Sequence, residues 1–166
     1  MKWMLDTDTC IAIIKKHPIA LKKLRGKSIG QVGISSISLG ELAFGAEKSS
    51  RPKDARAALE FLLALELAAF DEHAAMRYGE VRGSPARRGK PIGPLDTLIG
   101  SHAHVMDVIL VTHNTREFAQ IDGLQDVLLY VGRNGYRHHM ALTKGRVIDS
   151  IEEALKTYLG YELKVF

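Results

Sequence analysis

The stretch that decides the fold is residues 1–14, MKWMLDTDTCIAII, in which a short apolar run delivers Asp6 and Asp8 and passes at once into a second apolar segment. Residues 2–5 have the length and character of a buried strand, and residues 10–26 have the spacing of a broken helix. A strand that ends in acids and is followed by a helix is the opening unit expected of an α/β fold.

Strand and helix patterns continue to alternate along the chain. We therefore expect an α/β fold with a central, mainly parallel sheet flanked by helices, and ligands at the carboxyl ends of its strands. The later predicted segments are a strand at 31–38, a helix at 39–50, a helix and strand pair at 55–70, a helix at 71–83, a helix at 94–106, a buried strand at 107–112, and a loop with a short helix at 113–121.

The composition narrows the function classes. The chain has 166 residues, of which 46% are hydrophobic, enough for one compact domain with room for an appended piece. The net charge of +4 weakly favours a polyanionic partner. Because Cys10 is the single cysteine, an internal disulfide and a cysteine-based zinc site are excluded. No secretory leader or membrane-spanning run is present in the sequence, so we expect a soluble, cytoplasmic protein with no membrane partner.

Acidic and polar residues fall where the predicted strands end or the neighbouring helices begin. They are Asp6, Glu41, Asp96, Asn114 and Glu117. Carboxylates that meet at one sheet edge repel and raise one another's pKa unless they hold a hard divalent cation such as Mg²⁺ or Mn²⁺. Such cations activate water and neutralise a phosphodiester, which is the chemistry of metal-dependent nucleases.

Each acid also has a simpler interpretation. Asp6 or Asp8 could cap the following helix. Glu41 and Asp96, which we expect near helix starts, could be first-turn acids favoured by the helix dipole. Glu117 could be an ordinary surface glutamate. The joint pattern favours the metal site, because these acids are embedded in apolar sequence, where an isolated charge is costly.

Two other groups of polar residues also have both a functional and an ordinary interpretation. Arg87 and Arg88, in the loop 84–90, are candidate contacts for RNA phosphates, although a solvated loop is the commoner role. His102 and His104 are two residues apart on a predicted helix, a poor spacing for binding one metal ion together, so we expect structural or surface roles.

Four segments, in this order and spacing across residues 1–124, resemble the signature segments of PIN-domain ribonuclease toxins of the VapC type. They are MLDTDTCI at 4–11, ISSISLGELAFGA at 34–46, GKPIGPLDTLIGSHA at 89–103 and VILVTHNTREFAQIDGL at 108–124. The resemblance implies a PIN-like three-layer fold and a Mg²⁺- or Mn²⁺-dependent endoribonuclease. It also implies that Asp6, Glu41 and Asp96 are the metal-site acids.

The resemblance assigns roles to the remaining polar residues as well. Glu117 would be a further catalytic acid, and Thr112 with Asn114 would be the polar pair that closes the site. Asp8 would be a helix cap or a group behind the metal ligands. The family often has an aspartate where Asn114 stands, and Glu117 would compensate for that departure.

By the same resemblance, the reaction is in-line attack of a metal-activated water on an RNA phosphodiester, leaving a 3′-hydroxyl and a 5′-phosphate. The implied substrate is RNA, which for some relatives is a tRNA. The implied partners are a second copy of the chain in a homodimer and a VapB-type antitoxin whose C-terminal arm covers the acidic site.

Residues 125–166 continue beyond the matching segments. The sequence predicts a β-hairpin with an Asn-Gly turn, a helix and a short final strand, so we expect a PIN-like nuclease domain at 1–124 and a C-terminal extension at 125–166. A solvated surface is the commoner role for a basic hairpin. Its candidate RNA contacts are Arg133, Arg137, His138, His139, Lys144 and Arg146.

Two alternative functions stay open from the sequence. The Asp6-Thr-Asp8 opening also resembles that of haloacid-dehalogenase-type phosphatases, but Cys10 stands where that family has Thr or Val, and DVILVTHNTRE lacks its later acidic pair. The other alternative is a noncatalytic PIN-like module that binds RNA or protein, which only Asn114 favours.

Overall fold

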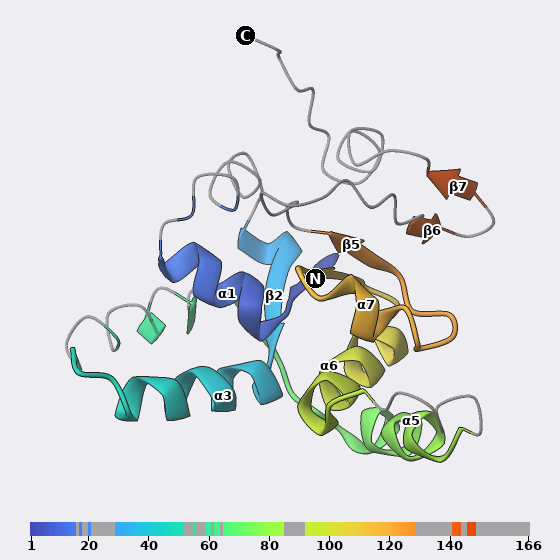
Figure 1. Ribbon diagram of the computed structural model, residues 1–166, viewed down its shortest axis with the longest axis horizontal. Helices are drawn as coiled ribbons and strands as arrows, with labels where there is room; N and C mark the ends of the chain where they lie inside the picture. The colour runs from blue at the N-terminus through green and yellow to red at the C-terminus, as the bar shows by residue number, and fades with distance from the viewer. Residues whose placement is uncertain are drawn as a thin grey trace, which may run out of the picture.

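The computed structural model describes residues 1–15, 17, 20, 29–51, 55, 59–60, 62–63, 65–84, 92–128, 141–143 and 146–148. Within these residues the chain forms a five-stranded, all-parallel sheet in the order β3-β2-β1-β4-β5. Figure 1 labels β2 and β5 of this sheet together with the helices around it. The strands are β1 (Trp3–Leu5), β2 (Val32–Ser35), β3 (Glu66–Ala68), β4 (Ile109–Thr112) and β5 (Asp126–Leu128). The helices are α1 (Thr7–Ile14), α3 (Ser36–Glu47), α5 (Glu72–Gly83), α6 (Pro94–Val105) and α7 (Thr115–Phe118), with a 3-10 turn, η1, at Ile29–Gln31.

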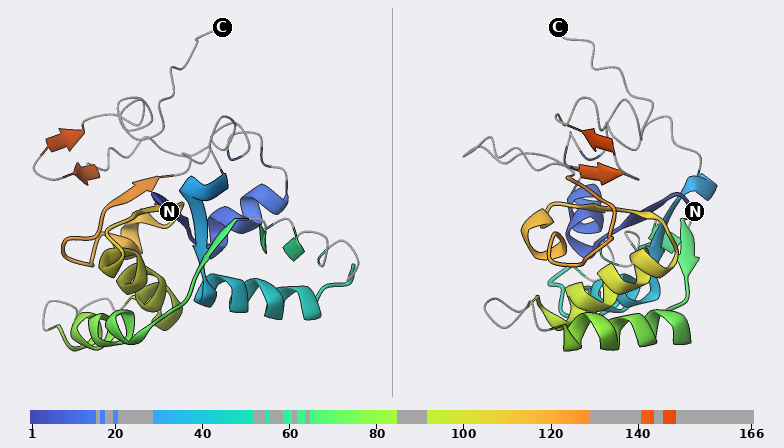
Figure 2. Two further views of the ribbon diagram at one scale, coloured as in Figure 1. Left: turned by 180° about the vertical axis from the view of Figure 1, so that it is seen from behind. Right: turned by 90° about the vertical axis from the view of Figure 1, so that its right-hand side faces the viewer.

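The sheet separates two hydrophobic cores, because successive side chains of a strand point to opposite faces. Trp3 and Leu5 of β1 pack in one core with side chains of α1, and Met4 packs in the other with side chains of α6 and α7. Helix α5 lies beside α6 on that second side (Figure 2). The expected three-layer α/β fold is therefore confirmed, with the sheet between two helical layers.

The register of the central strand brings distant parts of the chain to one edge. Leu5 pairs with Ile34 of β2 on one side and with Val111 of β4 on the other. The backbone N–H of Asp6 donates to the carbonyl of Val111 at 3.1 Å. Because all five strands are parallel, their carboxyl ends meet at the same edge of the sheet.

The boundary between β2 and α3 differs from the prediction. The strand ends at Ser35, whose hydroxyl accepts from the backbone N–H of Ile37 and caps α3, so the helix begins at Ser36 rather than near residue 39. A serine pair favours a helix cap over an extended strand. The prediction that Glu41 lies near the helix start is therefore wrong, and so is its interpretation as a first-turn acid, because Glu41 lies in the second turn.

Several predictions fall partly or wholly outside the described residues. The predicted helix at 10–26 is described as α1, which begins at Thr7, and only single residues beyond residue 15 are described. Arg87, Arg88 and the predicted turn at Asn134 lie outside the described part of the chain.

Among the residues that the structure describes, three short strands follow residue 124. Strand β5 pairs with β4 as the fifth strand of the parallel sheet, and β6 (Ala141–Thr143) pairs antiparallel with β7 (Arg146–Ile148). The side chains of the candidate RNA contacts at 133–146 lie outside what the structure describes. The division into two units at residue 124 stays a prediction.

The described helices are short. Helices α3, α5 and α6 have 12 residues each, and in the described ranges no helix has the length and apolar character needed to cross a membrane.

Candidate active site

Asp6 occupies the point where β1 turns into α1. Its backbone is extended, and its side chain is only 3% exposed. One carboxyl oxygen accepts from the backbone N–H of Thr9 at 2.7 Å, and the other accepts from the hydroxyl of Thr112 at the end of β4. Asp6 therefore caps α1 and faces β4 at the same time, since a carboxylate has lone pairs for several donors.

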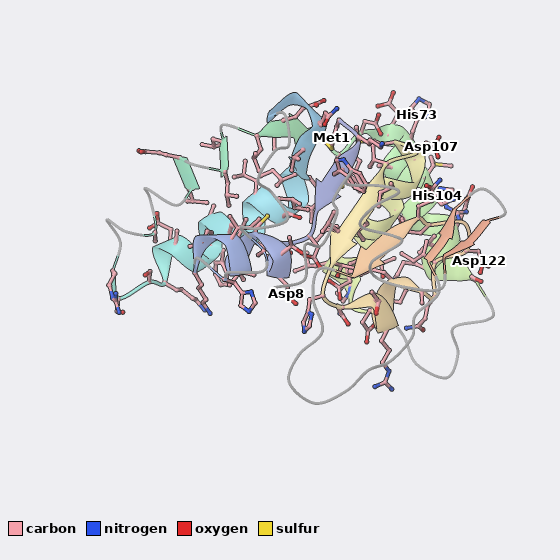
Figure 3. All side chains as sticks on the ribbon, turned by 90° about the horizontal axis from the view of Figure 1, so that it is seen from above. Met1, Asp8, His73, His104, Asp107 and Asp122 are labelled. Atoms are coloured by element: carbon pink, nitrogen blue, oxygen red, sulfur yellow. The ribbon has the colours of Figure 1, made fainter. Side chains whose placement is uncertain are left out.

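Asp8 does not have the capping role that was expected as one of its two interpretations. It lies one residue into the first turn of α1 and is exposed, because the chain leaves its extended conformation at Asp6 and not later. Figure 3 shows Asp8 at the start of α1, at the opposite end of the molecule from Met1 and Asp107. Asp8 therefore lies near the edge of the sheet at which the parallel strands end.

Asp96 reaches the same edge from α6. Pro94 begins this helix, and Asp96 lies in its first turn as predicted. Its carboxyl accepts from the side-chain amide of Asn114 at 3.1 Å, and the backbone N–H of Asn114 donates to the hydroxyl of Thr112 at 2.8 Å. Thr112 and Asn114 therefore connect Asp96 to Asp6 through a continuous set of hydrogen bonds.

Glu41 approaches from α3. Its carboxylate accepts a 2.5 Å hydrogen bond from the hydroxyl of Thr7, the first residue of α1. In the same helix, the hydroxyl of Thr9 donates to the carbonyl of Val111 at 2.9 Å, which holds α1 against β4. The first turn of α1 is thus hydrogen-bonded both to α3, through Thr7, and to strand β4, through Thr9.

Glu117 comes from the short helix α7 and is half-buried. One of its carboxylate oxygens, Oε2, is buried and has no hydrogen-bond partner among the described residues. A buried acceptor without a donor is costly unless another group, such as a cation, satisfies it.

The charges of these acids act on one another. The pKa of Asp96 is raised to about 6, first by burial and then by the charges of Asp6, Glu117, Glu41 and Asp8, all of which act in the same direction. Burial also raises the pKa of Asp6, although the hydrogen bonds from Thr112 and Thr9 oppose that shift. The structure therefore brings together the four acids that the sequence singled out.

The four acids form a set of possible ligands for a divalent cation. In the described part of the chain, no three His, Cys, Asp or Glu side chains form a geometric metal site, and Asp6, Asp96 and Glu41 are each hydrogen-bonded to a neutral donor instead. The donor set nevertheless consists of carboxylates, which hard cations prefer. Their mutual repulsion and the oxygen of Glu117 without a partner among the described residues are what a bound cation would relieve, so the donor set suits a hard divalent cation.

Sequence analysis did not single out Thr7 and Thr9. The available signal was the DTDT pattern, since threonine hydroxyls in a first helical turn commonly bond to nearby polar groups. Their partners, Glu41 and the carbonyl of Val111, lie 34 and 102 residues away in the chain, so only the tertiary fold could identify them.

Comparison with known proteins adds an independent line of evidence. The family described as "PIN domain" matches residues 3–124. The "tRNA(fMet)-specific endonuclease VapC" of Shigella flexneri is 40% identical over 126 residues, covering 75% of this chain and 96% of the relative. The protein of the same name from Salmonella typhimurium is 41% identical over the same coverage.

Solved structures give the same result. DNA-bound VapBC from Salmonella typhimurium contains a chain that superposes with a TM-score of 0.73 at 39% identity, covering 78% of this chain and 99% of that one. VapBC-1 from nontypeable Haemophilus influenzae superposes with a TM-score of 0.68 at 30% identity, covering 78% and 98%.

Proposed function

Because the chain belongs to the PIN domain family, with VapC ribonucleases among its relatives, we propose that it is a metal-dependent endoribonuclease and the toxin of a toxin-antitoxin pair. The observation that carries this proposal is the meeting of four carboxylates at the carboxyl edge of the sheet, where burial and mutual repulsion raise the pKa of Asp96 to about 6. This cluster is costly for the fold and has a clear use in holding a cation. Membership of the PIN domain family also argues against the phosphatase alternative.

The cation is Mg²⁺ or Mn²⁺, and Asp6, Asp96 and Glu41 are proposed to hold it. The fourth position falls to Glu117 rather than to Asn114. The amide of Asn114 already donates to Asp96, whereas Oε2 of Glu117 is buried and has no donor among the described residues. Asn114 stands where the family often has an aspartate, but this difference does not favour the noncatalytic alternative. Glu117 still provides a carboxylate nearby.

The bound cation would supply an activated water and neutralise the scissile phosphate. The chain's own residues orient the ligands. Thr112 donates to Asp6, Asn114 donates to Asp96, and Thr7 donates to Glu41, so the three carboxylates keep fixed directions. Fixed ligand orientation is what outer hydrogen bonds supply in metal sites. The products would carry a 3′-hydroxyl and a 5′-phosphate.

The relatives suggest the substrate and the partners. Two of them are named tRNA(fMet)-specific endonucleases, and we propose a tRNA substrate for this chain in the cytoplasm. The solved neighbours are VapBC complexes, so we propose a VapB-type antitoxin as the inhibitor and a homodimer as the toxin assembly.

The proposal is tested by incubating the full chain with total tRNA in Mg²⁺, in Mn²⁺ or in EDTA, with 5′-end analysis of the fragments. We expect metal-dependent cleavage that leaves 5′-phosphates and is lost in Asp6→Asn and Glu41→Gln. Glu47→Gln is the matched control, because Glu47 is an exposed glutamate at the other end of the same helix as Glu41. Cleavage that survives in EDTA would contradict the metal, and RNA binding without cleavage would support the noncatalytic module.

A further inference from the structure

His102 is a buried polar residue of α6 that the proposed reaction does not use. Its side chain is 2% exposed, and its Nδ1 atom lies 2.9 Å from the hydroxyl oxygen of Ser35, which is fully buried. Ser35 is the residue at which β2 ends and α3 begins. The pair therefore joins the start of α3 to α6, and these two helices carry Glu41 and Asp96 respectively.

The tautomer of His102 sets the direction of this hydrogen bond. The hydroxyl oxygen of Ser35 accepts from the backbone N–H of Ile37 at 3.1 Å as the cap of α3, and its proton stays available for donation. Burial lowers the pKa of His102, which favours the neutral imidazole. In the tautomer that carries its proton on Nε2, Nδ1 is an acceptor and Ser35 donates to it.

The same ring also packs against the segment between β3 and α5. The ring of Phe70 meets the imidazole edge-on, with centroids 5.4 Å apart and planes at 81°. The backbone N–H of Phe70 donates to the hydroxyl of Ser36 at 3.0 Å. His102 thus lies at a junction where the start of α3, the segment before α5 and the last turn of α6 are joined by directional contacts.

The junction is placed to control the spacing of two acids. Asp96 lies six residues before His102 on α6, and Glu41 lies six residues after Ser35 on α3. At 1.5 Å per helical residue, each acid is about 9 Å along its helix axis from the Ser35–His102 bond. A shift at the bond would therefore reach both carboxylates, since helices transmit displacement nearly rigidly.

We propose that His102 is a positioning residue which, through the hydroxyl of Ser35, holds α6 against α3 and keeps Asp96 and Glu41 at the spacing that one divalent cation requires. The inference rests on the proposed function. It adds to that function a residue that touches neither the cation nor the RNA.

The test measures Mn²⁺ affinity of the full chain by calorimetry without RNA, beside the melting temperature. In His102→Asn, the amide oxygen is bonded to Cγ as Nδ1 is, so it can still accept from Ser35. In His102→Leu no acceptor remains. We expect the dissociation constant for Mn²⁺ to rise about tenfold or more in His102→Leu, the effect of losing an outer orienting group. In His102→Asn it should stay within about threefold of the original value.

Val81→Ala is the control for a merely structural role. Val81 is buried on α5 in the same core as neighbouring residues of α6, and it makes no hydrogen bond through its side chain. We expect it to lower the melting temperature without changing the Mn²⁺ affinity. The inference is overturned if Val81→Ala weakens Mn²⁺ as much as His102→Leu does, or if His102→Asn and His102→Leu weaken it equally. Failure of the unsubstituted chain to bind Mn²⁺ would overturn the proposed function as well.

Discussion

At the scale of single residues, the ionised form of Asp96 lowers the stability of the metal-free fold. Its pKa in the folded chain is about 6, above the ordinary value of 3.8, so the folded state binds this proton more tightly than the unfolded state does. The resulting stabilisation is present in full below pH 3.8 and is lost as the pH rises through about 6. At neutral pH the ionised carboxylate therefore destabilises the metal-free fold.

This sign leads to a prediction for Asp96→Asn. In EDTA at pH 7.5 the variant should melt at a higher temperature than the original chain, and the gain should shrink at pH 4, where Asp96 is largely protonated. Its nuclease activity in Mg²⁺ should fall by about 100-fold or more, beyond the effect of losing an outer orienting group. Thermal melts at the two pH values test the first part, and a lower melting temperature at pH 7.5 would contradict it.

Cys10 gives a second prediction at this scale. Its thiol is fully buried, and burial together with the charge of Asp6 raises its pKa far above the ordinary value. Because the thiolate is the reactive form, Cys10 should not react with a thiol reagent such as Ellman's in the native chain. One equivalent should react after unfolding in guanidinium chloride. Rapid reaction of the native chain would show that α1 opens readily.

The position of the acids at one edge of the sheet could be predicted from the sequence, but their hydrogen bonds could not. Asp6 and Asp96 were identifiable because parallel strands end at one edge, which turns position along the chain into position in space. The donors Thr7 and Thr112 are ordinary residues in local terms. Their partners lie 34 and 106 residues away, so only the packing of α1, α3 and β4 brings them into contact.

At the scale of elements, the sheet leaves no room for a side chain at Gly33 of β2. A methyl group at this position would lie 2.4 Å from the carbonyl oxygen of Glu66 in β3 and 2.3 Å from the side chain of Met1. The clash with Met1 could be relieved by a new rotamer, whereas the carbonyl belongs to the neighbouring strand. The pairing of β2 with β3 therefore depends on a glycine.

We expect Gly33→Ala to lower the free energy of unfolding by about 2 kcal/mol, within the range for overpacked cores. The matched variant is Gly79→Ala on α5, where a methyl group meets nothing within 4 Å. That change should instead raise the free energy of unfolding by about 0.5–1 kcal/mol, the usual helix preference of alanine over glycine. Urea unfolding of both variants makes the comparison, and equal effects of the two would argue against the clash.

Most elements could be predicted because their apolar spacing and their caps agree. One exception, the start of α3, shows where local patterns conflict. In ISSIS the alternation of apolar and polar residues indicates a strand, while Ser35 is a good helix cap, and the cap prevails at that residue. The bond from Ser35 to His102 favours this outcome and comes from a helix that is distant in the sequence.

At the scale of the whole molecule, the relatives are almost fully covered by about three-quarters of this chain. A chain ending at residue 130 retains all five strands of the parallel sheet. We expect it to unfold cooperatively and to cleave RNA within about fivefold of the full chain, because a fold of this size buries a sufficient core. Circular dichroism melts and the tRNA assay test this. Aggregation or loss of the cooperative transition would contradict a nuclease unit that folds without residues 131–166.

The central position of β1 has a consequence for how the protein is made. The ribosome releases Asp6 and Glu41 early, but the neighbour of β1 on its other side, β4, is synthesised about a hundred residues later, and Asp96 and Glu117 emerge with it. The growing chain therefore cannot assemble the cluster until most of its length has left the exit tunnel. The acidic site is therefore completed only when β4 pairs with β1, late in the synthesis of the chain.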